Sequence, residues 1–479
     1  MKALLSVSNK EGIDYFASSL LTMGFELYGT DGTAKWLYER GIKVHKLSEI
    51  TGFSQLAGGR VKTLNEKVFE MILAPEGDHF DLIVVNLYPF ASSVSKGTDA
   101  MIENFDIGGV ALMRAAAKNY KRVTIISSPE QYEEFLKKYP LNIDDRREFA
   151  KKAMEKVIKY DTNILSHLFN SPFQIATEGI HKIRYGENPH QHAWVGKVAN
   201  NPSLLDKLNV VRGKLSYNNY IDLIAAARIA ASCGDNSAVI VKHTNPCGAS
   251  KFSKDPVETF KRALSGDPKS AFGGVLYING RIDLNLAKAI KPHFWDIISA
   301  KEITEEARKL FKKKSASLIE LAPFSSKMEW RVLDGVVLIQ ESDSGMPYKE
   351  LKCVTHRIPS AKEISDAKFG LEVIRHTKSN AVILVKDGML IGSGAGQPSR
   401  VDSAKIAIEK AKEFGHEVKG SVMISDGFFP FPDSVQIGIE NGIKCFVEPG
   451  GSKRDSESIS VCEKANASLI FTSKRLFRH

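Results

Sequence analysis

Short apolar runs alternate with segments of helical spacing over residues 1–130. Residues 3–7 form an apolar run of strand length, and apolar positions then recur at the spacing of one helix face from 13 to 21. Further strands are expected at 25–28, 43–47, 82–85 and 123–126, with helices at 33–40 and 110–117. This alternation predicts a parallel sheet covered by helices on both faces.

The pattern changes after this region. Residues 133–169 have the spacing of strongly charged helix, and we place a domain boundary near residue 175, around Ser171-Pro172. Beyond the boundary, helical segments are mixed with strands expected at 238–241, 274–278, 335–339 and 381–385. The second part is therefore expected to be α/β as well.

Two segments of the second part resemble each other. Residues 237–242 (SAVIVK) and 380–386 (NAVILVK) share a strand rich in Val and Ile that ends in lysine, with one extra residue in the second segment. Chance and duplication account equally well for such a match, because buried strands of this composition are common. With a duplication, the expected domains are 1–175, 176–360 and 361–479.

Composition places the chain among ordinary globular proteins. It has 479 residues, 43% hydrophobic and 25% charged, which is too long for one core. No apolar stretch approaches the ~18 residues that span a bilayer, and the first apolar run, Ala3-Leu4-Leu5, is too short for a signal peptide. The five cysteines lack Cys-x-x-Cys spacing, which argues against a disulfide framework or zinc knuckle. We expect a cytoplasmic protein without a membrane partner.

The charge favours anionic ligands. A formal charge of +10 suits either nucleic acid or small phosphorylated molecules. The longest basic run, Lys312-Lys313-Lys314, is expected to be a solvated helix end. The chain lacks an RNP-type aromatic pattern, a helix-turn-helix signature and a basic tail. We therefore expect small-molecule substrates and no nucleic-acid partner.

Two polar turns follow the first two expected strands. They are Ser6-Val7-Ser8-Asn9-Lys10 and Gly29-Thr30-Asp31-Gly32-Thr33. A helix N-terminus binds phosphate through its free N–H groups, and ligands of open α/β sheets gather at the carboxyl ends of strands. The alternative is simple helix capping by Ser8 and Asp31. Neither turn matches a Walker or dinucleotide-binding motif, so ATP and NAD have no support.

Longer motifs carry a specific resemblance that runs nearly end to end. In the first third they are RVKTL (60–64), VNLYPF (85–90), DIGG (106–109) and RAAAKN (114–119). In the rest they are RYGENPHQ (184–191), LSYNN (215–219), KHTNPCG (242–248), SAFGG (270–274), GAGQPSR (394–400), SDGFFPF (425–431) and PGGS (449–452). With these motifs in one order, the chain resembles the bifunctional purine biosynthesis family, which joins a phosphoribosylaminoimidazolecarboxamide (AICAR) formyltransferase to an IMP cyclohydrolase.

The resemblance implies a fold, two reactions and an oligomeric state. The fold is α/β, with an N-terminal methylglyoxal-synthase-like parallel-sheet domain followed by two cytidine-deaminase-like α/β subdomains. The reactions are formyl transfer from the co-substrate 10-formyltetrahydrofolate to the 5-amino group of AICAR, giving FAICAR, and dehydrative closure of FAICAR to IMP. A homodimer is implied, with the transformylase pocket built across the subunit interface. No metal and no tightly bound cofactor are implied.

The Lys242-His243 pair follows a buried strand and suits formyl transfer. The AICAR amine is a poor nucleophile because its lone pair is delocalised, so it needs a base and donors for the oxyanion. An imidazole titrates near neutral pH, and an ammonium stabilises negative charge. Both reach one substrate only if the chain turns there, which Asn245-Pro246 allows. From the residues alone, an ordinary surface or core histidine is the alternative.

The resemblance assigns the remaining site residues. AICAR contacts are Arg184, Tyr185, His243, Gly273, Asp296, Asn380, Arg400, Phe428 and Arg475, and folate contacts are Val401, Asp433, Ser452 and Lys453. Cyclohydrolase catalysis falls to Lys62, Tyr88, Asp106 and Lys118, the last as proton donor or acceptor. FAICAR and IMP contacts are Ser8, Asn9, Lys10, Thr30, Asp31, Gly32, Thr33, Arg60, Lys62, Thr63, Val85, Asn86, Asp106 and Ile107. Core packing is the alternative role for Phe428.

Two departures and one geometric constraint bear on the cyclohydrolase assignment. The family usually has Gly at Asp31, where a carboxylate beside phosphate is unfavourable unless it points away. It also usually has His-Pro at Asn65-Glu66. One straight helix over 106–118 would separate Asp106 from Lys118 by about 18 Å, so a shared pocket requires a shorter helix or a ligand lying along it.

A zinc deaminase is the enzymatic alternative. His243-x-Asn245-Pro246-Cys247 echoes the deaminase signature. That chemistry needs a Glu two residues after the His and a second Cys three residues after the first. This chain has Asn245 and Ser250 at those places, so we expect no zinc site.

Overall fold

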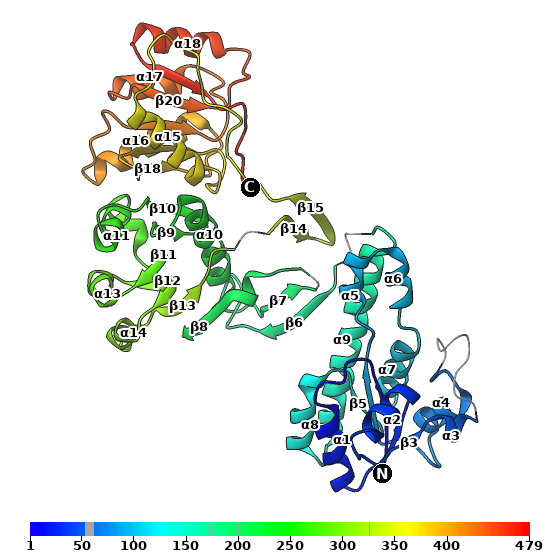
Figure 1. Ribbon diagram of the computed structural model, residues 1–479. Coiled ribbons are helices and arrows are strands. Elements are labelled where there is room, and N and C mark those ends of the chain that lie inside the picture. Colours follow the sequence, from blue (N-terminus) through cyan, green and yellow to red (C-terminus); the bar gives the residue numbers. More distant parts are fainter. Residues whose placement is uncertain (53–61, 172–174, 200, 325) are drawn as a thin grey trace. The chain divides into compact units, whose positions relative to one another are not determined.

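The computed structural model describes residues 1–52, 62–171, 175–199, 201–324 and 326–479. The chain divides into two compact units, Met1–Glu178 with Val198–Asn201, and Gly179–Lys197 with Pro202–His479 (Figure 1). Within the described ranges, no helix is long and apolar enough to cross a membrane.

The first unit is a parallel sheet between two layers of helices. Its strands pair in the order β3-β2-β1-β4-β5, all parallel. They are β1 (Lys2–Val7), β2 (Glu26–Gly29), β3 (His45–Lys46), β4 (Leu82–Asn86) and β5 (Thr124–Ile126). The helices are α1 (Ile13–Thr22), α2 (Asp31–Tyr38), α3 (Ser48–Thr51), α4 (Glu66–Leu73), α5 (Phe90–Ser93), α6 (Thr98–Glu103), α7 (Gly108–Lys118), α8 (Tyr132–Lys138) and α9 (Ile143–His167), with 3-10 turns η2 (Val94–Lys96) and η3 (Pro129–Gln131).

Alternate residues of the central strands supply two cores in this unit. Leu4 packs in the core formed by α4, α7 and α9, whereas Ala3 and Leu5 pack in the core formed by α1, α2 and α8. All of β4 is buried, as expected for a parallel strand covered on both faces. The parallel sheet predicted from the apolar pattern is therefore confirmed.

The charged helical region divides into two helices. The first, α8, ends before Tyr139-Pro140, because the residue before a proline disfavours helical backbone. The second, α9, begins after Asn142, whose side chain accepts the N–H groups of Asp144 and Asp145. These local signals lie inside the single charged segment expected from the sequence.

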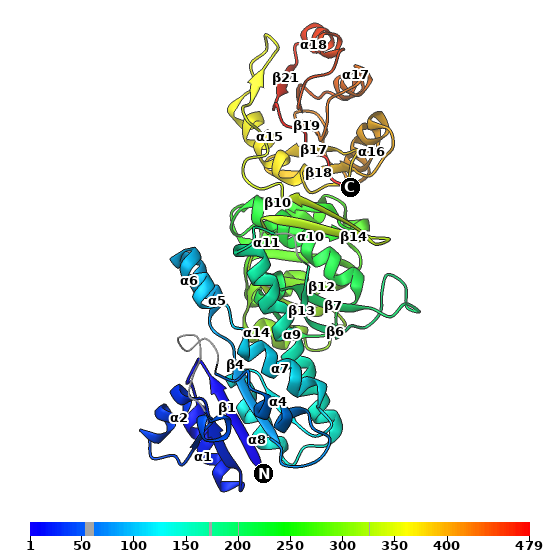
Figure 2. The ribbon, with the colours of Figure 1, turned by 90° about the vertical axis from the view of Figure 1, so that its right-hand side faces the viewer.

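The second unit is built on one mixed sheet (Figure 2) with the order β16-β21-β20-β19-β17-β18-β10-β9-β11-β12-β13-β8. Its strands are β8 (Leu208–Arg212), β9 (Ala238–Lys242), β10 (Asn245–Ser250), β11 (Gly274–Ile282), β12 (Trp295–Ile303), β13 (Ser317–Leu321), β16 (Lys352–Cys353), β17 (Val382–Lys386), β18 (Met389–Gly394), β19 (Val422–Ser425), β20 (Cys445–Glu448) and β21 (Ser468–Phe471). Two hairpins pair separately, β6 (Thr177–Lys182) with β7 (Trp194–Val198) and β14 (Met328–Leu333) with β15 (Val336–Glu341).

The two halves of the large sheet repeat one another. From the centre outward the first half runs β10-β9-β11-β12-β13-β8, and the second runs β18-β17-β19-β20-β21-β16. The alignment needs no gap, since the N-cap Ser216 of the helix before β9 corresponds to the N-cap Ser360 of the helix before β17, and Lys242 to Lys386. The internal repeat is therefore real, and the extra residue inferred from the sequence is not needed. This duplicated α/β architecture agrees with the expected fold class.

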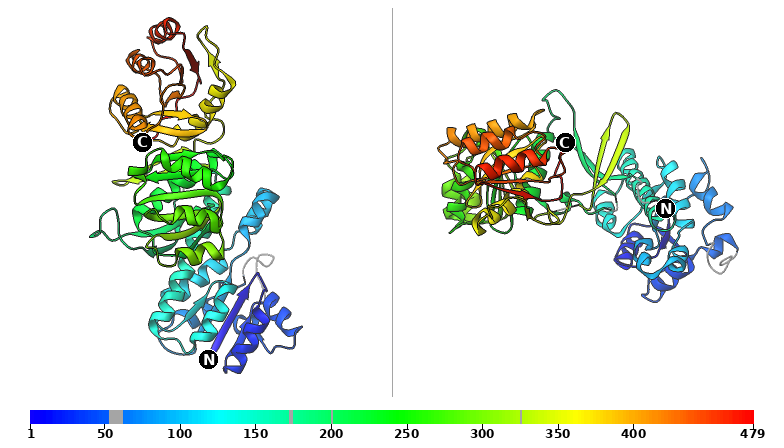
Figure 3. Two further views of the ribbon diagram at one scale, coloured as in Figure 1. Left: turned by 90° about the vertical axis from the view of Figure 1, so that its left-hand side faces the viewer. Right: turned by 90° about the horizontal axis from the view of Figure 1, so that it is seen from above.

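Helices cover both faces of the duplicated sheet (Figure 3). Helices α10 and α15 share one face, while α11, α13 and α14 cover the other face of the first half and α16, α17 and α18 that of the second. The helices of this unit are α10 (Tyr217–Cys233), α11 (Pro256–Ser265), α12 (Pro268–Ala271), α13 (Leu284–Ile290), α14 (Glu305–Phe311), α15 (Ala361–Ile374), α16 (Arg400–Glu413), α17 (Asp433–Glu440) and α18 (Asp455–Lys464), with the 3-10 turn η4 (Leu204–Lys207).

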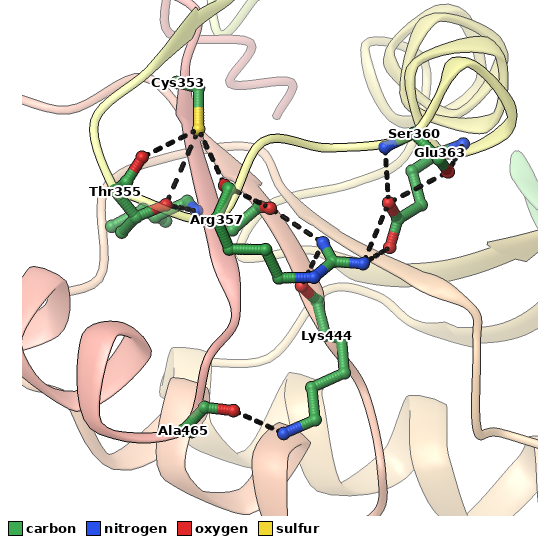
Figure 4. Close-up of polar contacts among 9 residues, drawn as sticks. Cys353, Thr355, Arg357, Ser360, Glu363, Lys444 and Ala465 are labelled. Carbon is green, nitrogen blue, oxygen red and sulfur yellow. Dashed lines mark hydrogen bonds and ion pairs between the residues drawn. The ribbon is translucent and has the colours of Figure 1, made fainter.

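A polar network anchors the start of α15 (Figure 4). Ser360 and Glu363 form a capping box, in which the Glu363 carboxylate accepts the Ser360 N–H at 2.8 Å. Arg357 donates to the same carboxylate at 2.9 and 3.2 Å and to the Lys444 carbonyl at 3.1 Å. Because Lys444 directly precedes β20, this network ties the helix to the sheet.

Candidate active sites

A cavity of about 520 Å³ opens at the carboxyl ends of β1, β2 and β4. Most of the predicted cyclohydrolase residues line it, and they come from several separate segments. They are Ser8, Lys10, Thr30, Gly32, Thr33, Lys62, Thr63, Val85, Asn86, Tyr88, Asp106 and Ile107. The parallel sheet thus brings them together at the edge where ligands of such sheets bind.

Asn86 organises the turn after β1. Its side-chain oxygen accepts the N–H groups of Ser8 and Asn9 at 2.5 and 2.9 Å and the Ser8 hydroxyl at 2.8 Å. Its amide nitrogen donates to the Asn9 carbonyl at 2.8 Å. The N-caps of α1 and α2 are Gly12 and Thr30, so the alternative in which Ser8 and Asp31 cap these helices is wrong.

Two lysines face this cavity. The Lys10 ammonium donates to the Thr33 hydroxyl at 3.1 Å. Burial, with a smaller contribution from the charge of Lys62, lowers the pKa of Lys10. An anion between the two ammonium groups offsets their repulsion, which suits a phosphorylated ligand. Asp31 begins α2 outside the residues that line the cavity, so its carboxylate is not placed beside that ligand.

Asp106 is the buried carboxyl of the cavity, with 8% of its surface exposed. It accepts the Gly109 N–H at 2.6 Å and the Tyr88 N–H at 3.2 Å. Burial raises its pKa, while these two amides and the Lys62 charge oppose the rise. A Cβ at Gly109 would lie 2.7 Å from an Asp106 oxygen, so a side chain there would displace the Asp106 carboxyl group. Asp106 lies just before α7 and lines the cavity.

The predicted site residues leave out part of the cavity wall, namely Ser6, Val7, Ile102, Glu103, Phe105, Gly108 and Gly109. The paired glycines of the DIGG motif were the available signal, since a Cβ at Gly108 would lie 2.8 Å from the Thr63 hydroxyl oxygen. Of the predicted residues, Asn9, Asp31 and Lys118 are not among those described as lining the cavity, and Arg60 lies outside the described residues.

The position of Lys118 follows from the length of α7. This helix of 11 residues starts at Gly108, beside the cavity, and ends at Lys118. Such a helix is about 16 Å long, so the separation expected from the sequence remains. Asn65, which with Glu66 stands where the family usually has His-Pro, has a local structural role. It caps α4 by accepting the Lys67 N–H at 3.0 Å.

A second cavity, of about 320 Å³, lies where the two halves of the large sheet meet at β10 and β18. Lys242 and His243 both line it. His243 (φ 49°) and Thr244 (φ 66°) form a two-residue turn between β9 and β10. Positive φ at both positions is the geometry of a tight hairpin turn. The turn that a joint role of Lys242 and His243 requires is therefore present.

The neighbours of this turn are mostly backbone groups. The Lys242 ammonium donates to the Gly273 carbonyl at 2.7 Å and to the Phe272 carbonyl at 3.2 Å. Gly273, a predicted AICAR contact, thus meets Lys242 through its backbone carbonyl. Asp222, which sequence reasoning missed, accepts the Thr244 N–H at 2.7 Å. A carboxylate in the middle of a helix gave no sequence signal for this contact.

A further group of predicted residues surrounds Arg400. Its guanidinium donates to Ser425 at 2.9 Å, to the Asn380 side chain at 2.9 Å and to the fully buried Asp426 at 2.7 Å. The Phe477 ring lies 5.7 Å from the Arg400 guanidinium and 4.5 Å from that of Arg475. Asn380, Arg400 and Arg475 are thereby gathered at one end of the second half.

Phe428 lies in the loop that follows Asp426, and 41% of its surface is exposed. Its neighbour Phe429 is fully buried. The alternative in which Phe428 belongs to the core is therefore wrong, and the side chain is free to contact a ligand.

The other predicted residues occupy loops and helix starts. Arg184 lies over the Tyr185 ring at 5.3 Å, and Asp296 is an exposed residue of β12. Val401 and Asp433 stand in the first turns of α16 and α17, and Ser452 and Lys453 in the loop after β20. Among the described residues, these and the Arg400 group do not line the second cavity. Within one chain, the predicted transformylase residues thus form separate groups.

The described part of the chain offers little to a metal ion. No group of three or more His, Cys, Asp or Glu side chains there is arranged to hold a metal ion. The expectation that no metal is bound stays a prediction.

Comparisons with known proteins cover the whole chain. A family model described as AICARFT/IMPCHase bienzyme matches residues 116–410, and one described as MGS-like domain matches residues 12–111. Many relatives match over their full length, among them proteins with the name bifunctional purine biosynthesis protein PurH. The protein of Persephonella marina is 40% identical, covering 100% of this chain and 99% of the relative. That of Aquifex aeolicus is 41% identical over 100% of both, and that of Desulfitobacterium hafniense 38% identical over 100% and 99%.

Proposed function

This chain belongs to the AICARFT/IMPCHase bienzyme family, and we propose that its two reactions are divided between its two compact units. It is a bifunctional enzyme of purine biosynthesis, which transfers a formyl group from 10-formyltetrahydrofolate to AICAR and closes the product FAICAR to IMP. We assign ring closure to residues 1–175 and formyl transfer to the subdomains 176–360 and 361–479.

The observation that carries the first assignment is the cavity at the ends of β1, β2 and β4. Lys10, Thr30, Gly32 and Thr33 suit the phosphate of FAICAR, and Asp106, which accepts the Tyr88 N–H, lines the same cavity. During closure the carboxamide nitrogen attacks the formyl carbon, and the formyl oxygen leaves as water with one proton from each nitrogen. We propose that Lys62, Tyr88 and Asp106 take part in moving these protons, and the role of Lys118 as proton donor or acceptor stays a prediction.

The pH dependence of ring closure tests this site. Burial raises the pKa of Asp106 above the ordinary aspartate value, so its carboxylate forms at a higher pH than that value. We expect the closure rate to rise as pH increases through that raised value. Asp106→Asn should remove this rise and lower the turnover of supplied FAICAR by about 10²–10⁴-fold. Calorimetric titration should show IMP binding retained. An unchanged rate in Asp106→Asn contradicts the assignment.

The turn with Lys242 and His243 carries the second assignment. In the proposed mechanism the His243 imidazole takes a proton from the AICAR amine as the new C–N bond forms. The Lys242 ammonium stabilises the oxyanion of the tetrahedral intermediate. As this intermediate collapses and the bond from the formyl carbon to the folate nitrogen breaks, the His243 imidazolium returns the proton to that nitrogen and tetrahydrofolate leaves. Arg400, Asn380 and Arg475 bind the nucleotide, and Val401, Asp433, Ser452 and Lys453 bind the folate.

We further propose that the enzyme works as a homodimer. The β14–β15 hairpin pairs with no third strand among the described elements (Figure 1), and its side chains Val332, Leu333, Val336, Val337 and Leu338 are 43–62% exposed. Apolar surface of this kind marks an interaction site. The separate groups of transformylase residues in one chain support the same proposal, because a second copy could bring one group beside the other.

Sedimentation tests the dimer. In Leu333→Asp with Val336→Asp, charges on the hairpin should shift the enzyme toward monomer and abolish formyl transfer. In the unsubstituted enzyme, transfer per chain should fall on dilution below the dimer dissociation constant. A monomer with full transfer activity contradicts the proposal.

We also propose a cytoplasmic location and no tightly bound cofactor. The five cysteines are free, which fits the reducing cytoplasm. Both reactions need only proton movement and oxyanion stabilisation beyond the folate co-substrate, so no tightly bound cofactor is assigned. Stoichiometric metal in active enzyme, with activity lost on chelation, contradicts this part.

A further inference from the structure

Asp222 of α10 holds the turn that carries His243. Its carboxylate accepts the Thr244 N–H at 2.7 Å. Burial raises the pKa of Asp222, while the Thr244 amide, the charge and backbone amide of His243 and the charge of Lys242 oppose the rise. Each opposing group belongs to the turn or directly precedes it. The carboxyl group therefore faces the turn as a whole.

The second half of the duplicated fold contains the same device. Asp366 of α15 accepts the Asp387 N–H at 3.0 Å and the Gly388 N–H at 2.6 Å. These two residues have φ of 57° and 69° and join β17 to β18. In the alignment without gaps, Asp222 corresponds to Asp366 and the 243–244 turn to the 387–388 turn.

The two turns differ in what they carry. In the second half, Lys386 pairs with Glu417 at 2.8 Å and Asp387 with Lys362 at 2.5 Å, which are surface ion pairs. In the first half, Lys242 and His243 line the second cavity. The same turn and carboxylate acceptor thus carry surface ion pairs in the second half and the residues of the proposed chemistry in the first half.

The 243–244 turn depends on its carboxylate acceptor more than the 387–388 turn does. Thr244 has φ of 66°, a region that β-branched residues rarely adopt, whereas Gly388 adopts the equivalent φ without steric cost. Strain of this kind persists only where surrounding contacts fix the backbone. The hydrogen bond from Thr244 to Asp222 is such a contact.

We propose that Asp222 is a positioning residue for formyl transfer, which fixes the 243–244 turn so that Lys242 and His243 face one substrate. This inference rests on the proposed role of His243 as the base. A misplacement of about 1 Å at a reacting group costs on the order of 10²-fold in rate. Loss of the acceptor should therefore lower the turnover number and leave AICAR binding nearly unchanged.

Asp366 provides the matched control for the test. Full-length Asp222→Ala and Asp366→Ala are compared for kcat and KM of formyl transfer, for closure of supplied FAICAR and for Tm. Both variants lose backbone acceptors, so both should have a lower Tm. Only Asp222→Ala should lose transfer, with kcat lower by about 10–100-fold and KM for AICAR within about threefold. Closure should match the unsubstituted enzyme in both.

Two conservative variants complete the design. Asp222→Asn keeps an oxygen acceptor and should recover most of the lost kcat. Asp222→Glu keeps the charge but moves the carboxylate by one methylene, so its kcat should also fall. This variant provides the test if Asp222→Ala does not fold. Equal loss in Asp222→Asn and Asp222→Ala, or an unchanged kcat in Asp222→Glu, overturns the positioning role.

The parallel variant His243→Ala separates this inference from the proposed function. If His243→Ala retains transfer, the assignment of the base fails. If His243→Ala loses transfer while Asp222→Ala keeps it, or if Asp366→Ala loses as much as Asp222→Ala, only the positioning role fails.

Discussion

Burial decides the behaviour of single carboxyl groups in this enzyme. Glu448 at the end of β20 is fully buried, and one of its oxygens accepts the Phe429 N–H at 2.5 Å. Its other oxygen has no partner among the described residues. Burial raises the pKa of Glu448 to about 8, with the Asp455 charge adding to the rise and the Phe429 amide and Arg400 charge opposing it.

This pKa predicts how stability changes with pH. The folded state holds the Glu448 proton up to about pH 8, whereas the unfolded chain releases it near the ordinary value of 4.5. Stability from this proton is complete below 4.5 and is lost as pH rises through 8. Glu448→Gln should therefore raise Tm relative to the unsubstituted enzyme at pH 9 and change it little at pH 5. The effect corresponds to several kcal/mol, at about 1.4 kcal/mol per pH unit.

Calorimetric unfolding across pH 5–9 measures this effect. The control is Glu341→Gln, which removes an exposed carboxylate and should show no change of the Tm difference with pH. A Tm difference that stays constant with pH for Glu448→Gln contradicts the prediction.

Single residues show where sequence reasoning reached its limit. Motif resemblance named most of the residues that line the first cavity, and the apolar pattern marked the turns after β1 and β2 that hold some of them. Motif resemblance gave no sign of Asp222 or Glu448, whose partners are backbone amides distant in the chain. The exposure of Phe428 beside the buried Phe429 depends on which side of a loop faces the core. An aromatic run does not encode that choice.

At the scale of elements, apolar periodicity predicted the buried strands well. Strands such as β4 and β17 are apolar on both faces and stand out from the polar segments around them. Strands β6 and β7 were missed because most of their residues are at least partly exposed and carry no apolar run. The repeat was ambiguous for a related reason, since only its most buried strand retains visible similarity.

Two equivalent glycines let helices lie close against the paired central strands. A Cβ at Gly248 in β10 would lie 2.1 Å from the Ala263 carbonyl oxygen of α11, and a Cβ at Gly392 in β18 would lie 2.1 Å from that of Ala407 in α16. Gly248→Ala and Gly392→Ala should each destabilise the second unit by at least about 1–3 kcal/mol, because backbone must move. Denaturant unfolding measures the loss. A change below about 0.5 kcal/mol in either variant contradicts this packing.

At the scale of the whole molecule, the chain forms two compact units that meet in sequence at Glu178 and Gly179. The boundary near 175 was placed where the strongly charged helical segment ends and a pattern with strands begins. Residues 172–174 beside it lie outside the described ranges. Composition alone could not place it more closely, because the first unit also includes Val198–Asn201.

A fragment of residues 1–178 tests whether the first unit is independent. It contains both of its hydrophobic cores and the described lining of the first cavity. It should fold cooperatively and close supplied FAICAR at a rate within about tenfold of the full chain, because a domain of this size supports its own core. Circular dichroism and the closure assay measure the two properties. A folded fragment without closure activity contradicts the prediction.

The central claim is that formyl transfer and ring closure occupy separate units, and paired measurements in the full-length enzyme test it most directly. Each half-reaction is assayed in His243→Ala and in Asp106→Asn, with formyl transfer started from AICAR and closure from supplied FAICAR. We predict that His243→Ala loses transfer by about 10²–10⁴-fold and keeps closure, and that Asp106→Asn does the reverse. If either variant, properly folded, loses both reactions, the two-site account is wrong.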